Sequence, residues 1–113
     1  MDWQKDYFQE LNQAENARKN GNEGMARVCS RRACGILIGE YLRRQEIVYQ
    51  NPSAYERIKY LSDLPGISKQ VRELANNFLV HVLPDHNLPV NVDLISEVRT
   101  LEKLLLRDEK IIE

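Results

Sequence analysis

The sequence predicts an all-α fold, an up-and-down bundle of four main helices with one further short helix. Its composition is the first reason, because 113 residues hold only 5 Gly and 4 Pro and are rich in Leu, Glu, Arg, Ala and Lys. Periodicity is the second, because apolar residues recur at three- and four-residue steps and no stretch alternates as a strand would. Length is the third. A chain of 113 residues makes one domain, residues 1–113, with a single core.

The first helix is expected from about Asp2 to Lys19. Asp2 can cap it, because its carboxylate can accept hydrogen bonds from the first turn. The helical spacing is carried by Trp3, Tyr7, Leu11, Ala14 and Arg18. The turn 20–22 ends the helix, since Gly21 tolerates the left-handed conformation that a helix end requires.

The second helix is expected to be the longest, from Glu23 to about Tyr49. Its apolar and small residues cover more than one side, so it either lies centrally among several helices or contacts a second subunit. Gly35 and Gly39 stand one turn apart on it, and each costs about 1 kcal/mol relative to Ala. The close approach of another helix backbone would offset that cost.

Three shorter helices follow, each beginning at a residue that can cap it: Ser53, Ser68 and Asp93. The first of them runs to about Leu64, with Ser53 and Glu56 spaced as a capping box and with Tyr55, Ile58 and Leu61 as its buried edge. The second extends to about Val82. A loop with two prolines, 84–91, precedes the last helix.

Net charge and cysteine content limit the classes of partner that this protein can bind and the cellular compartment in which it is expected. Sixteen basic and seventeen acidic residues give a net charge of −1, so no overall field attracts nucleic acid. The longest apolar run, 33–39, is too short to span a membrane, and no signal peptide is visible. Cys29 and Cys34 would point about 140° apart on a helix, so no disulfide joins them. We therefore expect a cytoplasmic protein with free thiols and no membrane partner.

The segment 76–81 is the first candidate for chemistry. On a helical wheel His81 lies at the border of the apolar face, with Asn77 one turn before it. An imidazole there can titrate near neutral pH and serve as a general acid or base, and Asn77 could bind the ring or a phosphate oxygen. The residue pattern alone favours the plainer interpretation, a boundary histidine hydrogen-bonded to a carbonyl or to water.

This segment resembles the signature of the HEPN superfamily, in which an Arg is followed after four to six residues by a His, often as Arg-Asn-x-x-x-His. Asn77 and His81 match the Asn and the His, whereas Asn76 stands at the Arg position. Residues 90–95 resemble the family's entry into its last helix, and residues 26–35 resemble small bacterial HEPN-like proteins. The resemblance implies a usually dimeric bundle that is either a ribonuclease or the partner of a minimal nucleotidyltransferase.

The departure at Asn76 bears on activity. The resemblance implies that the Arg would bind the scissile phosphate while the His moves a proton, and a neutral amide cannot supply the cationic fork of a guanidinium. Losing one preorganised donor costs about 2.7–4 kcal/mol at comparable sites. Arg72, one turn before Asn76, is a possible substitute, although nine residues separate it from His81. We therefore expect a degenerate ribonuclease site.

A basic row on the second helix is the next candidate. Arg27, Arg31 and Arg32 could hold phosphates or the acidic face of a partner. The simpler alternative is that they form ordinary surface ion pairs, with Glu23 placed for Arg27. We favour this alternative, because no aromatic residues interleave to stack bases.

A metal or cofactor is not expected. His81, Asp85 and His86 are residue types that bind zinc, but they combine a helix end with a proline-flanked loop and have no supporting cysteine pair. No glycine-rich phosphate loop is present either.

Two functions follow from the sequence. The leading hypothesis is a non-catalytic HEPN-like module that forms a homodimer and binds a protein, such as a nucleotidyltransferase, or a nucleotide or RNA. The alternative is a metal-independent ribonuclease that uses His81, Asn77 and an arginine from elsewhere. A monomer would result if the third helix and the loop 84–91 covered the second helix.

Overall fold

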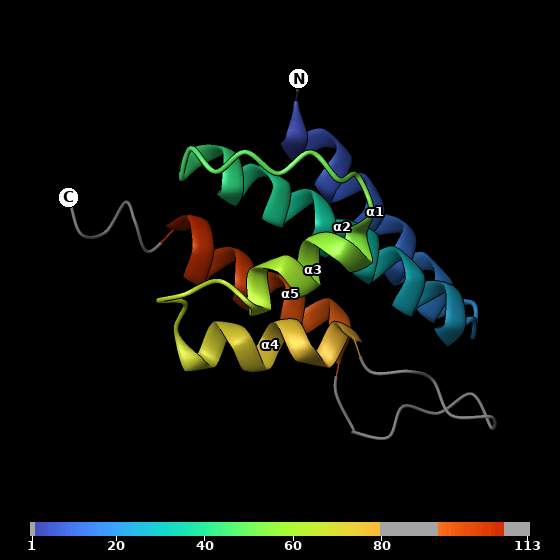
Figure 1. Ribbon diagram of the computed structural model, residues 1–113. Helices are drawn as coiled ribbons and strands as arrows, with labels where there is room; N and C mark the ends of the chain where they lie inside the picture. Colours follow the sequence, from blue (N-terminus) through green and yellow to red (C-terminus); the bar gives the residue numbers. More distant parts are fainter. Residues whose placement is uncertain (1, 80–92, 108–113) are drawn as a thin grey trace.

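The computed structural model describes residues 2–79 and 93–107, and over these ranges the chain is helical throughout its regular structure (Figure 1). The helices are α1 Trp3–Lys19, α2 Glu23–Arg44, α3 Ala54–Ser62, α4 Lys69–Leu79, α5 Leu94–Glu102 and a closing π-helical turn, η1 Lys103–Arg107. No strand occurs within the two ranges. The predicted all-α class and helical bundle are confirmed.

Helix α2 is the centre of the bundle, as its two-sided apolar pattern predicts. It packs against α1, α3 and α5, and α4 is held mainly by α3 and α5. Figure 1 shows α1 and α2 as an antiparallel hairpin, with α3 crossing in front of α2 and α4 lying along the side away from α1. Among the described residues, no helix is both long and apolar enough to cross a membrane.

The predicted caps are confirmed at the start of four helices. Asp2, Ser53, Ser68 and Asp93 each accept a hydrogen bond from a backbone N–H of the following first turn. The capping box at α3 is formed differently from the expectation, because the N–H of Ser53 donates to Asn51 Oδ1 at 3.0 Å. Asn51 thus supplies the acceptor that the Glu56 side chain was expected to provide.

The expected end of the second helix at Tyr49 is wrong, since α2 stops at Arg44. The Glu46 N–H donates to the Arg43 carbonyl and the Ile47 N–H donates to the Leu42 carbonyl, at 3.0 and 2.9 Å. This is the Schellman arrangement, which needs a left-handed residue after the helix. Glu46 adopts it, with φ of 57°. The helical pattern continues beyond this residue in the sequence, so periodicity alone overshoots the end.

Replacing Glu46 by glycine should therefore stabilise the protein. A side chain in the left-handed region costs about 1–2 kcal/mol, and glycine avoids this cost while losing some entropy on folding. We expect Glu46→Gly to raise the free energy of unfolding by about 0.5–1 kcal/mol in urea denaturation. Glu46→Ala is the control, because it removes the same carboxylate and keeps the Cβ. An equal gain from the alanine variant would assign the effect to charge.

Helix α3 sits on the glycine face of α2. A Cβ added at Gly35 would lie 2.7 Å from the Ala54 Cβ and 2.8 Å from its Cα. At Gly39 an added Cβ would lie 2.6 Å from Nη1 of Arg57. The two glycines thus admit α3 of the same chain, which is the arrangement that the monomer alternative describes. Tyr55 is 38% exposed, so its predicted burial is wrong, whereas Ile58 and Leu61 are buried as expected.

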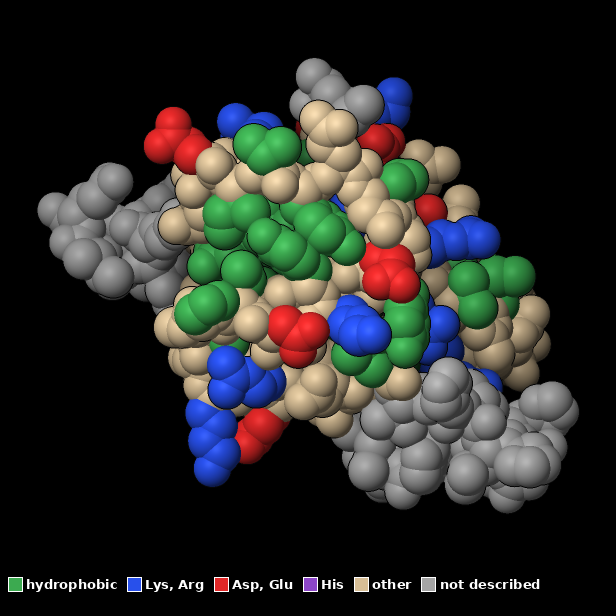
Figure 2. Space-filling model, viewed as in Figure 1, with side chains coloured by type: hydrophobic (Ala, Val, Ile, Leu, Met, Phe, Trp, Pro, Cys, Tyr) green, Lys and Arg blue, Asp and Glu red, His purple; other side chains and the backbone are tan. Residues whose placement is uncertain are grey.

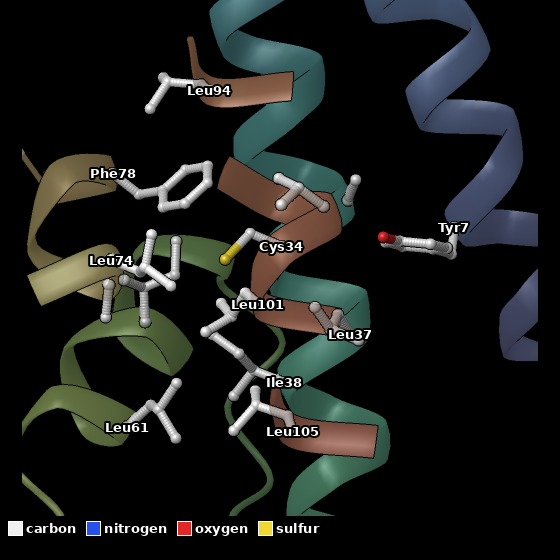
Figure 3. Close-up of a cluster of buried hydrophobic side chains, with 14 of the residues drawn as sticks. Tyr7, Cys34, Leu37, Ile38, Leu61, Leu74, Phe78, Leu94, Leu101 and Leu105 are labelled. Carbon is white, nitrogen blue, oxygen red and sulfur yellow. The ribbon is translucent and has the colours of Figure 1, made fainter. Parts of the chain in front are cut away.

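All five α-helices contribute to the core, and Figure 3 shows its part around α2, α3, α4 and α5. Leu74 and Phe78 of α4 meet side chains of α2 and α5, and Tyr7 reaches toward them from the α1 side. Leu105 and Leu106 are consecutive and both 3% exposed, so the core receives two neighbouring leucines where α5 passes into η1. Both cysteines are free, as predicted, and both are buried.

Candidate functional site

The helix that carries the predicted motif is described only as far as Leu79. Asn76 is exposed, and Asn77 is half-buried with its Nδ2 donating to Glu97 Oε1 of α5 at 2.9 Å. His81 lies outside the described residues, as do Asp85 and His86. The motif's described part therefore places a carboxylate, not a cation, beside the Asn77 amide.

Two arginines flank this helix at its opposite ends. Arg72 donates from Nε to the Ser62 carbonyl at 3.0 Å, which draws its side chain toward the end of α3. Arg31 of α2 donates from Nε to the Phe78 carbonyl at 3.1 Å. The guanidinium that reaches the C-terminal end of α4 is thus Arg31, whereas the sequence suggested Arg72.

The predicted basic row does not form one surface. Arg27 and Arg31 are half-buried and Arg32 is exposed. Glu23, which the sequence places for Arg27, pairs with Arg18, whose Nε lies 2.7 Å from Glu23 Oε1. Arg32 lines a cavity, together with residues of α1 and α3.

A trough runs along α2, bordered by α1 and by the start of α3. It consists of two cavities of about 510 and 440 Å³ that share Ile36 and Arg57 as walls. Trp3 lines the larger cavity and Glu10 and Arg32 line the smaller. We call the two cavities together the α2 trough. Cavities of several hundred cubic ångströms with a few converging polar groups are typical of small-ligand sites.

Arg57 is the best-positioned cation of the α2 trough. Its Nε donates to the Asn51 carbonyl at 2.9 Å, and its Nη1 donates to the Gly35 carbonyl at 3.1 Å. Because two carbonyls and the bare Gly39 backbone fix the guanidinium, it need not be ordered when an anion arrives. Within the described part of the chain, no carboxylate lies within 4.0 Å of Arg57 or Arg32.

Arg43, a third arginine that lines the trough, already has a counter-ion. Its Nη2 lies 2.6 Å from Oε2 of Glu40, a carboxylate that also accepts from Arg44 at 2.8 Å. The hydrogen bonds from Arg43 and Arg44 outweigh the effect of burial and lower the pKa of Glu40. Arg44 also lies 5.9 Å from the centroid of the Trp3 ring. Arg32 and Arg57 are therefore the two described arginines of the α2 trough that have no carboxylate within 4.0 Å.

A third cavity, of about 390 Å³, lies where α1 meets the start of α5. Its two arginines are paired: Arg18 with Asp93 at 3.0 Å and Arg99 with Glu15 at 2.6 Å. These contacts join the two helices and cap α5, so they explain the cluster structurally.

The surroundings of the two cysteine thiols do not favour reactivity. Burial raises the pKa of Cys34 far above its usual range, and burial followed by the charge of Glu10 raises that of Cys29. Neutral buried thiols are poor nucleophiles and poor metal ligands. Within the described ranges, no group of three or more His, Cys, Asp or Glu side chains could hold a metal ion.

Arg57 is the residue that sequence reasoning missed. It is the single arginine of a short helix and belongs to no basic run. The signal that points to it is the pair Gly35 and Gly39, whose spacing predicts the close approach of another helix backbone. One of them admits a guanidinium.

Comparisons were made with family models, with curated proteins and with solved structures. No family model, curated protein or solved structure matches this chain.

Proposed function

We propose that this chain is a non-catalytic, HEPN-like helical module that binds an anionic partner in the α2 trough. The observation that carries the proposal is the convergence of Arg32 and Arg57 on one cavity without a carboxylate within 4.0 Å of either guanidinium among the described residues. Guanidinium groups bind phosphates and carboxylates through paired N–H donors. The site is therefore on α2 and α3 and not on the motif helix α4.

The absence of catalysis is supported by the surroundings of Asn77. Its amide donates to Glu97, and a carboxylate at this point would repel a phosphate and the negative charge that develops on it during cleavage. Asn76 contributes no cation.

One observation favours the ribonuclease alternative. Arg31 is anchored by Nε to the Phe78 carbonyl, so its other N–H donors lie close to the end of α4. If this chain cleaves RNA, Arg31 is the arginine that would replace the missing one of the motif.

Self-association stays a prediction. Gly35 and Gly39 no longer argue for a second subunit, because α3 of the same chain occupies their face. The binding site proposed here lies within one chain and does not depend on a dimer.

Binding by fluorescence anisotropy tests the proposal, with a labelled single-stranded RNA and a labelled Glu-rich peptide as probes. We expect at least one probe to bind and Arg32→Glu to weaken that binding more than tenfold. Arg72→Glu is the control, since it makes the same charge change on an exposed residue away from the α2 trough. Binding of neither probe, or equal losses in both variants, would reject the trough as the site.

The same RNA, followed for cleavage, tests the alternative. We expect no turnover above background and no change on His81→Ala or Arg31→Ala. A hundredfold drop in cleavage on both substitutions would establish the ribonuclease in place of the non-catalytic module.

A further inference from the structure

The smaller cavity of the α2 trough brings together three charged groups from three helices: Glu10 of α1, Arg32 of α2 and Arg57 of α3. None of them forms an ion pair with another within 4.0 Å, although all three line one space of about 440 Å³. Unpaired opposite charges around one cavity call for a ligand that satisfies both signs.

Glu10 is the unusual member, since a carboxylate weakens a site for a simple anion. Its side chain is half-buried and lines the cavity, and among the described residues no arginine or lysine nitrogen lies within 4.0 Å of its carboxylate. The carboxylate acts on the nearby Cys29 thiol, so it faces the protein as well as the cavity. A half-buried carboxylate without a cationic partner can be satisfied by a ligand that donates a hydrogen bond from the cavity.

Oxyanions differ in whether they have such a donor. Sulfate is fully deprotonated near neutral pH and offers only acceptors. Inorganic phosphate keeps at least one P–OH group there, and a phosphate monoester does so below its second pKa of about 6. A protonated phosphate can thus accept hydrogen bonds from two guanidinium groups and donate one to a carboxylate.

We infer that this cavity binds a protonated phosphate group, with Arg32 and Arg57 as donors to its oxygens and Glu10 as the acceptor for its P–OH. The inference rests on the proposed function and names the chemical class of the ligand. It also assigns Glu10 the role of selecting phosphate over sulfate, because Glu10 repels any tetrahedral anion that has no proton to give.

Isothermal titration calorimetry of the full chain at pH 7 tests the inference, with inorganic phosphate and sulfate compared at equal ionic strength. We expect phosphate to bind at least tenfold more tightly than sulfate. Glu10→Gln should reduce this preference to less than about threefold, since an amide can donate to sulfate. Glu15→Gln is the matched control on α1, because Glu15 pairs with Arg99 outside the cavity, and it should keep the full preference.

Phenyl phosphate distinguishes a monoester from free phosphate as the source of the group. A monoester site predicts tighter binding of phenyl phosphate at pH 5.5 than at pH 8, with the gain lost in Glu10→Gln. A site for free phosphate predicts no binding of phenyl phosphate at either pH.

Three outcomes separate this inference from the proposed function. If phosphate and sulfate bind equally, and Arg32→Ala weakens both, the α2 trough is an anion site but the role of Glu10 is wrong. If phosphate preference persists in Glu10→Gln, the assignment of Glu10 is likewise overturned. If neither anion binds, the inference fails, and the RNA and peptide probes alone decide the proposed function. Circular dichroism of each variant checks that it is folded.

Discussion

Gly35→Leu is expected to destabilise the protein by about 3 kcal/mol, at the upper end of the range for overpacked sites. Even a single Cβ at this position would come within 2.8 Å of the Cβ and Cα of Ala54, and backbone atoms cannot move aside as a flexible side chain can. Helix α3 must shift away from α2, and Arg57 then loses its hydrogen bond to the Gly35 carbonyl. Urea denaturation measures the loss directly.

Gly24→Ala is the matched control in the same helix. The nearest atoms to an added Cβ at Gly24 lie 3.8 and 4.0 Å away, so the substitution meets no obstruction. Alanine favours a helix by up to about 1 kcal/mol over glycine, and we expect Gly24→Ala to be neutral or mildly stabilising. If Gly35→Leu kept full stability and halved the mass seen by light scattering, the glycine face would be a dimer interface.

Tyr7→Phe is expected to lower the free energy of unfolding by about 1–3 kcal/mol, because it removes a hydrogen-bond donor from a buried carboxylate. The Tyr7 hydroxyl donates to Glu102 Oε1 at 3.3 Å. Tyr7 is 0% exposed and Glu102 is 9% exposed. This contact joins the start of the chain to α5. Tyr55→Phe, at an exposed tyrosine, is the control and should change stability by less than about 0.5 kcal/mol.

The same contact predicts an alkaline pH dependence. Burial, and then the negative charge of Glu102, raise the pKa of Tyr7 well above its ordinary value of 10.0. A raised pKa in the folded state means that the contribution of Tyr7 is fully present below pH 10 and is lost as the pH rises from there toward the folded-state pKa. The stability gap between the wild type and Tyr7→Phe should therefore narrow above pH 10. A gap that widened would contradict this assignment.

The fold was predictable because its signals are local. Caps such as Asp93 and Ser53 depend on residues within one turn, and the apolar spacing of α4 follows from the helical period alone. The end of α2 was not predictable in this way. Glu46 adopts a left-handed conformation that favours glycine. The sequence has no glycine at this position that would predict the end of the helix.

The candidate site was harder to predict, because its members converge only through packing. Arg57, Arg32 and Glu10 lie on three helices and are far apart in the sequence. The spacing of Gly35 and Gly39 predicted a close approach, but spacing cannot say whether the neighbour is another chain or α3 of the same one. The motif around Asn77 is visible in the sequence by resemblance, whereas Arg32 and Arg57, the two arginines of the smaller cavity, lie on other helices.

The location of the binding site is tested most directly by NMR titration of the ¹⁵N-labelled chain with inorganic phosphate. We predict that the side-chain Nε–H signals of Arg32 and Arg57 and the backbone amides of 32–36 and 53–57 shift with one common affinity. Arg72 serves as the internal reference and should stay unchanged. Shifts that gather instead on Arg31, on 74–79 and on 94–97 would place the site at the motif helix and contradict the assignment to the α2 trough.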